Sequence, residues 1–250
     1  MRFELNIILI TLAGGLAGFC LNYLADVLPV YRRFTHSICQ DCHEPIGWKD
    51  YILFHACPYC GRQQWLRRGL IAAITPLLLV ALYIFPSGRL TFWENAVILV
   101  FFLLVAIIDI EHRLIMHPVS LAGAVIGLVL GTRMHGIFPT LIGGAAGFLM
   151  MFVLYYLGGL FAKVLGKARG EEIEEIPLGF GDVNLSGVLG LLLGWPGIAA
   201  GLFFAILAGG VFSGGYILVL KLLRRYQPFS AIPYAPFLLL GTAILLFATK

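Results

Sequence analysis

Long apolar stretches, separated by short polar connections, make up most of the chain. Eight of them approach the length of about 20 residues that crosses a bilayer as a helix. They lie at 5–28, 69–86, 93–110, 118–134, 138–162, 182–195, 197–221 and 231–249. The pattern predicts an all-α polytopic membrane protein with about eight transmembrane helices, in which the short run 182–195 is tilted or partly re-entrant.

Two polar segments, 29–68 and 163–181, are much longer than the other connections. If the eight spans alternate, both segments lie on the side of the membrane that holds most of the 17 lysines and arginines. The positive-inside rule places that side in the cytoplasm. We therefore expect a first transmembrane helix within 1–28, a small cytoplasmic insertion over 29–68, and a membrane core over 69–250 with 163–181 as a cytoplasmic loop.

The composition excludes an ordinary soluble domain. Only 12% of the residues are charged, whereas a soluble domain carries about 25%. The first apolar run, 5–28, is longer than the apolar core of a cleavable signal peptide, so we expect it to remain as a helix. Membrane lipid is an expected partner and nucleic acid is not. The uniformly apolar surface leaves the oligomeric state open.

Four cysteines form two CxxC pairs within the insertion, Cys39 with Cys42 and Cys57 with Cys60. This spacing is typical of a tetrahedral zinc site, and four thiolates leave no open position for a substrate. Two disulfides or four unrelated thiols are the alternatives, but the cytoplasm keeps thiols reduced. We therefore predict a small zinc-ribbon-like insertion that is held together by a structural Zn²⁺.

Two aspartates stand at the ends of apolar runs. Asp109 closes one run and Asp182 opens another, and the orientation above places both at the cytoplasmic boundary. An ionised carboxylate at a bilayer centre costs about 2.5–3.5 kcal/mol on insertion scales, so such residues usually have a function. In a close pair one acid is protonated while the other is ionised, which suits water attack on a peptide carbonyl. Gly179 and Gly181 lack a Cβ, so an extended substrate backbone could approach Asp182.

Two other functions fit paired membrane acids. A proton-coupled membrane transporter also uses intramembrane carboxylates, and a scaffold could use them only to cap helices. A transporter built from inverted repeats would show related halves with broken helices, and we find no convincing repeat. Residue chemistry alone leaves the peptidase and the transporter open.

Four motifs, in the same order along the chain, resemble the bacterial type IV prepilin peptidase family. Gly179-Phe180-Gly181-Asp182 resembles its GxGD motif, and Asp109 followed by His117-Pro118 is similar to its first-aspartate motif. Ile232-Pro233-Tyr234-Ala235-Pro236-Phe237 resembles its IPxxPF segment, and the paired CxxC motifs match in position. Presenilin-like proteases share the GxGD motif, but they carry a Tyr-Asp pair where this chain has Ile108-Asp109.

The resemblance implies a multi-pass aspartyl endopeptidase of the bacterial inner membrane. Asp109 and Asp182 would be catalytic, and Gly179, Gly181, Pro233 and Pro236 would be candidate substrate contacts. The implied partners are type IV prepilins or type II secretion pseudopilins, which have a basic cytoplasmic leader and an apolar membrane helix. Cleavage would follow a glycine at the boundary between the two.

Many members of the family also methylate the new N-terminus with S-adenosylmethionine, a function linked to the N-terminal region. Gly18-Phe19-Cys20-Leu21-Asn22 resembles the GSFLN element of that region. The arginine and the acid that usually follow correspond to Val27 and Ala72 here, and Asn184 replaces a frequent lysine after the second aspartate. The loss of the arginine and the acid argues against methyl transfer, although S-adenosylmethionine remains a candidate cofactor beside Zn²⁺.

Overall fold

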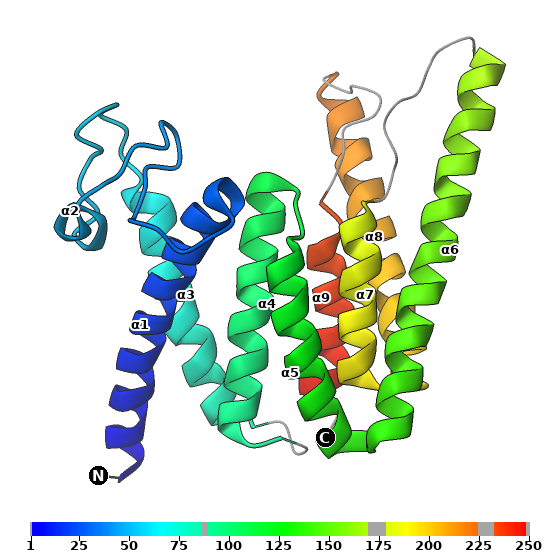
Figure 1. Ribbon diagram of the computed structural model, residues 1–250, viewed down its shortest axis with the longest axis horizontal. Coiled ribbons are helices and arrows are strands. Elements are labelled where there is room, and N and C mark those ends of the chain that lie inside the picture. The colour runs from blue at the N-terminus through cyan, green and yellow to red at the C-terminus, as the bar shows by residue number, and fades with distance from the viewer. Residues whose placement is uncertain (1, 87–89, 170–178, 225–232, 249–250) are drawn as a thin grey trace. The chain divides into compact units, whose positions relative to one another are not determined.

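The computed structural model describes residues 2–86, 90–169, 179–224 and 233–248 (Figure 1). Within these ranges the chain is mostly helical and has no β-strand, only an isolated bridge between Ile38 and Pro45. The helices are α1 (Arg2–Tyr31), α2 (Trp48–Ile52), α3 (Trp65–Ile84), α4 (Phe92–His112), α5 (His117–His135), α6 (Ile137–Arg169), α7 (Phe180–Leu193), α8 (Gly197–Leu222) and α9 (Ala235–Ala243), which continues into a π-helical turn (Ile244–Ala248).

Each predicted apolar run corresponds to a helix, which confirms the fold class. Among the helices of the described residues, six are long and apolar enough to cross a membrane: α1, α3, α4, α5, α6 and α8. Helix α7 has 14 residues and is therefore about 21 Å long, which is less than a hydrocarbon core of about 30 Å. This short length agrees with the prediction for 182–195. Helix α6 continues to Arg169, beyond the predicted end at 162, and residues 170–178 of the predicted loop lie outside the described ranges.

The chain divides into two compact units, 1–108 and 109–250. In the first unit, α1 packs against α3 through small residues. A Cβ added to Gly14 would lie 2.5 Å from Pro76 Cα, and one added to Gly18 would lie 2.9 Å from Ala72 Cα. Such close backbone approach is the usual way in which membrane helices associate.

In the second unit, α7 is the central helix and packs against α5, α6 and α9 (Figure 1). Glycines on the neighbouring helices allow the backbones to meet: Gly131 of α5 lies against Leu191 O, and Gly143 of α6 lies against Gly190 O. Nine of the 14 residues of α7 are buried. The helix that carries Asp182 is therefore fixed by backbone contacts on two sides.

Gly190→Ala tests this packing and should lower the free energy of unfolding by about 1–3 kcal/mol, the usual cost of overpacking. The added Cβ would press on the carbonyl of Gly143 and lie 3.1 Å from Gly144 Cα, both of which are backbone atoms. Gly215→Ala on α8 is the control, since nothing lies within 4 Å of its Cβ position. Thermal unfolding in detergent should separate the two variants, and equal midpoints would contradict the close contact of α6 with α7.

Candidate functional site

Asp109 lies in the last turn of α4 and is buried. Its Oδ2 accepts a hydrogen bond of 3.2 Å from the backbone N–H of Ala235, the first residue of α9. This N–H has no partner within its own helix, and the partial positive charge of the helix N-terminus favours a carboxylate. Arg113 also lies close enough for its charge to act on Asp109. Pro236 follows in the first turn of α9, where a missing N–H costs nothing.

Asp182 is the third residue of α7 and is also buried. Its Oδ2 accepts a hydrogen bond of 3.2 Å from the N–H of Gly179, while its own N–H donates to Gly179 O at 3.0 Å. The bond to Oδ2 is one half of a capping box, and the backbone carbonyl of Gly179 replaces the side-chain acceptor of the other half, so both bonds fix the start of the helix. Gly181 serves packing, because a Cβ there would lie 2.8 Å from Ile115 Cβ. A substrate contact at Gly179 or Gly181 stays a prediction.

The two acids, which stand on different helices, lie close enough for the charge of Asp109 to act on Asp182. Tyr234 joins them, since it precedes Ala235 and its phenol interacts with the charge of Asp182. In the sequence, Tyr234 was recognised only as part of the IPxxPF-like segment, and no role in the site was predicted for it. The spacing of the prolines around it was the available signal. One acid near another, with a phenol beside them, is an arrangement suited to proton transfer.

The four cysteines of the insertion also come together. Sγ of Cys39 lies 3.7 Å from that of Cys60, and Cys42 lies 3.7 Å from Cys57. All four sulfurs lie within 4.8 Å of one another. Thiolates at about 2.3 Å from one tetrahedral ion lie about 3.8 Å apart, whereas a disulfide needs about 2.05 Å. The geometry therefore fits a single metal ion.

Both CxxC turns have the same backbone geometry. The N–H of His43 donates to Cys39 O, and the N–H of Gly61 donates to Cys57 O, each at 2.9 Å. His43 and Gly61 both have a positive φ, at 60° and 67°. Burial raises the pKa of the Cys57 thiol, but hydrogen bonds from the N–H groups of Cys60 and Tyr59 and from the Cys42 and Cys60 thiols together lower that pKa to about 7. A thiolate, the form that binds metal, is therefore accessible near neutral pH.

A buried cluster of charges lies between α1, α3 and the cysteine-bearing insertion. Asp26 accepts hydrogen bonds of 2.6 Å from Arg67 Nη1 and from the Tyr51 hydroxyl, and Arg68 Nη2 lies 3.4 Å from its second oxygen. The Arg68 guanidinium stacks 4.1 Å from the centre of the Tyr51 ring and reaches Ile38 O at 3.5 Å. The cluster therefore connects two membrane helices with the insertion.

Sequence reasoning missed this cluster, because it compared Val27 and Ala72 with an arginine and an acid of the family. The region does contain an acid and two bases, at Asp26, Arg67 and Arg68. The family pattern has the arginine in the first segment and the acid in the second, whereas here the acid is on α1 and the bases are on α3. An aspartate inside the first apolar run, with two arginines directly before the second, was the signal that could have shown it.

A helical membrane protein with two neighbouring, buried aspartates at helix ends has the general form of an intramembrane aspartyl hydrolase. Comparisons with known proteins show which family this part of the chain is similar to. Residues 96–214, which include both acids, match the type IV leader peptidase family. The match covers a little under half of the chain and confirms the resemblance over that region.

Several curated proteins are similar to most of the chain, and each bears the name prepilin leader peptidase/N-methyltransferase. The protein from Pectobacterium carotovorum is 27% identical over 216 residues, which cover 82% of this chain and 71% of that protein. The one from Klebsiella pneumoniae is 28% identical over 211 residues, covering 78% and 88%. The one from Bacillus subtilis is 26% identical over 190 residues, covering 75% and 68%. No solved structure matches the chain.

Proposed function

We propose that the protein is a membrane aspartyl endopeptidase that removes the basic leader from type IV prepilins or type II secretion pseudopilins. One observation carries the proposal: Asp109 and Asp182 are buried close to one another, and each is held through Oδ2 by a backbone N–H. These bonds orient the remaining oxygens. The family and its relatives favour this function over a proton-coupled transporter.

In the proposed reaction the two carboxyl groups share one proton. The ionised acid removes a proton from water, and the water oxygen attacks the carbonyl carbon of the scissile bond. The protonated acid donates to the carbonyl oxygen and stabilises the charge that develops there. The tetrahedral intermediate then collapses, the C–N bond breaks, and a proton passes from the dyad to the leaving amine. The proton inventory belongs to the pair and not to one aspartate.

We place the protein in the bacterial inner membrane with both acids at the cytoplasmic side. The distribution of lysine and arginine supports this orientation. A basic leader would remain in the cytoplasm in that case, and the bond that follows it would lie at the depth of the acids. The proposed activity is leader cleavage. The same experiment also detects methyl transfer.

The direct test is mass spectrometry of a prepilin incubated with the purified protein in detergent, with S-adenosylmethionine present. The expected result is cleavage after the glycine that precedes the apolar helix, with release of the intact leader. A prepilin that stays whole with a folded, metal-loaded protein would contradict the peptidase proposal. An additional mass of one methyl group on the new N-terminus would extend the function to methyl transfer.

We also propose that the cysteine cluster holds one structural Zn²⁺. The sulfur separations support it, and so does the small core of the insertion, which consists of Ile46 and Tyr51 beside the buried cysteines. Such a core stabilises little by itself, so a metal ion is needed to hold the segment. Zinc would neutralise part of the thiolate charge and fix both CxxC turns.

Metal analysis of the purified protein should therefore find about one zinc ion per chain, as expected for four thiolates around one ion. Cys57→Ser combined with Cys60→Ser should remove it, because only two thiolates then remain. Cys20→Ser is the matched control, since this cysteine lies on α1 outside the cluster. Undiminished zinc in the double variant, or loss of zinc in the control, would contradict the assignment.

A further inference from the structure

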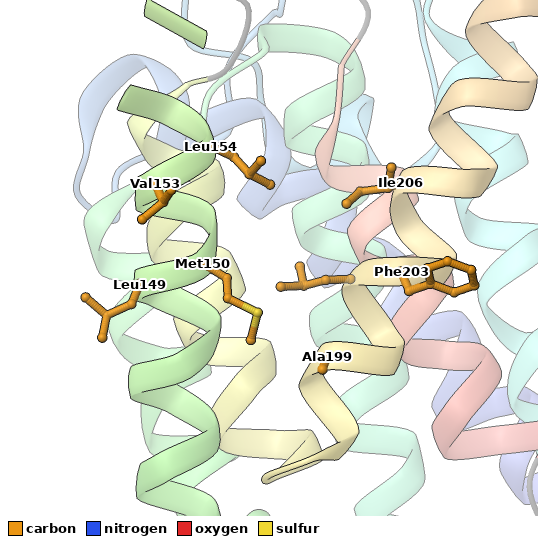
Figure 2. Close-up of a pocket in the computed structure, with 8 residues that line it drawn as sticks. Leu149, Met150, Val153, Leu154, Ala199, Phe203 and Ile206 are labelled. Atoms are coloured by element: carbon orange, nitrogen blue, oxygen red, sulfur yellow. The ribbon is translucent and has the colours of Figure 1, made fainter. Parts of the chain in front are cut away.

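A groove of about 520 Å³ lies between α6 and α8 in the second unit (Figure 2). Its sides are formed by Val153 and Leu154 of α6 and by Phe203 and Ile206 of α8, and Leu202 is the buried residue of its lining. All the side chains that line it are apolar. The lining residues of each helix recur at helical spacing, so each helix presents one face to the groove.

The groove is closed at one end because α6 and α8 meet there. A Cβ added to Gly147 of α6 would press on Ser186 O of α7 and lie 3.0 Å from Ile198 Cγ1 of α8. Beyond this contact α6 and α8 diverge, and the groove lies between them (Figure 2). Its open end lies at Leu154 and Ile206, farther along both helices (Figure 2).

From the open end, α6 leads to Asp182. Tyr155 follows Leu154 directly, and its ring packs edge-on against Phe180 with the ring centres 5.9 Å apart. Phe180 precedes Asp182 by two residues in the first turn of α7. The α6 side of the groove therefore ends beside the helix start that carries the second acid.

The α8 side leads to Asp109. Gly209 follows Ile206 by three residues, an axial rise of about 4.5 Å. A Cβ added to Gly209 would lie 3.3 Å from Tyr234 Cε2. Tyr234 precedes Ala235, whose N–H holds the Asp109 carboxylate. Both walls of the groove thus reach the surroundings of the two acids from its open end.

In the proposed function, the part of the substrate that follows the scissile bond enters the membrane. A backbone in the hydrocarbon region must satisfy its hydrogen bonds internally, so the part of the substrate beyond that bond is a helix with an apolar surface. We propose that the groove between α6 and α8 binds the first turns of this substrate helix and so places the scissile bond at Asp109 and Asp182. This inference rests on the proposed peptidase function.

The size of the groove agrees with this occupant. Its lining on α8 runs from Ala199 to Ile206, a rise of about 10.5 Å, which matches about two turns of a helix. Contacts of this kind depend on shape and dispersion, because lipid and protein are equally apolar. Substrate residues spaced by three or four positions after the cleaved bond would therefore decide how well a substrate fits.

Ile206→Trp tests the proposal by filling the open end of the groove. Val211→Trp is the matched control, since Val211 is 76% exposed on α8 and does not line the groove. Each variant is assayed with a prepilin that keeps its apolar helix and with a short peptide that ends soon after the scissile bond. With Ile206→Trp, kcat/KM for the long substrate relative to the short one should fall at least about tenfold, a change of about 1.4 kcal/mol, while the control keeps the wild-type ratio.

A photo-crosslinking amino acid at position 206, in a background of Asp182→Asn, makes the test independent of cleavage. It should capture the apolar helix of the prepilin, and the same group at position 211 should not. An unchanged ratio of the two substrates in Ile206→Trp, or equal capture at both positions, would overturn the groove assignment. Capture of lipid alone by the crosslinker at position 206 would overturn it as well. Failure of the peptidase itself is distinct, because the wild type would then cleave neither substrate.

Discussion

Asp109→Asn and Asp182→Asn should each reduce leader cleavage by about 10²–10⁴-fold, the contribution of a positioned general acid or base. Asparagine keeps the size of the side chain but can neither accept a proton from water nor deliver one. Its amide oxygen can still accept the N–H of Ala235 at position 109 or of Gly179 at position 182. Both helix starts therefore keep their anchoring bonds, and the variants should fold.

The measurement is kcat/KM for a purified prepilin, together with the thermal midpoint of each variant in the same detergent. Glu111→Gln is the matched control, because Glu111 lies on α4 near Asp109 and contacts His112 at 4.0 Å. We expect near wild-type cleavage from this control. Retained cleavage in either folded aspartate variant would exclude the dyad. A large loss of stability with unchanged specific activity would instead favour the helix-capping role.

Asp26→Asn should destabilise the first unit by about 3–5 kcal/mol, the range for a buried ion pair that loses one partner. Arg68 is only 1% exposed, and without the Asp26 carboxylate its charge would remain buried without compensation. Asparagine keeps one acceptor oxygen, so one of the two hydrogen bonds from Arg67 and the Tyr51 hydroxyl would also be lost. The cluster also contacts the insertion, so zinc should be released more easily from the variant.

Asp50→Asn provides the contrast, since Asp50 pairs with His55 at 3.0 Å on the surface of the same insertion. An exposed pair of this kind contributes about 0–1 kcal/mol. Unfolding titrations should separate the two variants clearly. Adding Arg68→Met to Asp26→Asn should recover part of the lost stability, because it removes the uncompensated charge. A strictly additive double variant would show that the two residues do not interact.

The sequence by itself was sufficient for the helices and for the grouping of the four cysteines. A bilayer leaves the backbone little choice but the helix, so each long apolar run predicts a span directly. The CxxC pairs lie within one short insertion, where spacing alone limits the geometry. The positions of Asp109 and Asp182 at helix ends were also readable, because a carboxylate in an apolar run is conspicuous. That they act together as a catalytic pair stays a prediction.

The tertiary structure alone decided which residues meet across helices. Apolar faces turn equally well toward lipid or toward another helix, so hydropathy does not reveal the packing register. Backbone contacts such as that of Gly143 with Gly190 set this register in the second unit. The N-terminus of α9 on Asp109, the place of Tyr234, the groove between α6 and α8, and the Asp26 cluster all depend on such contacts. All of these residues are visible in the sequence, but only the packing of the helices brings them together.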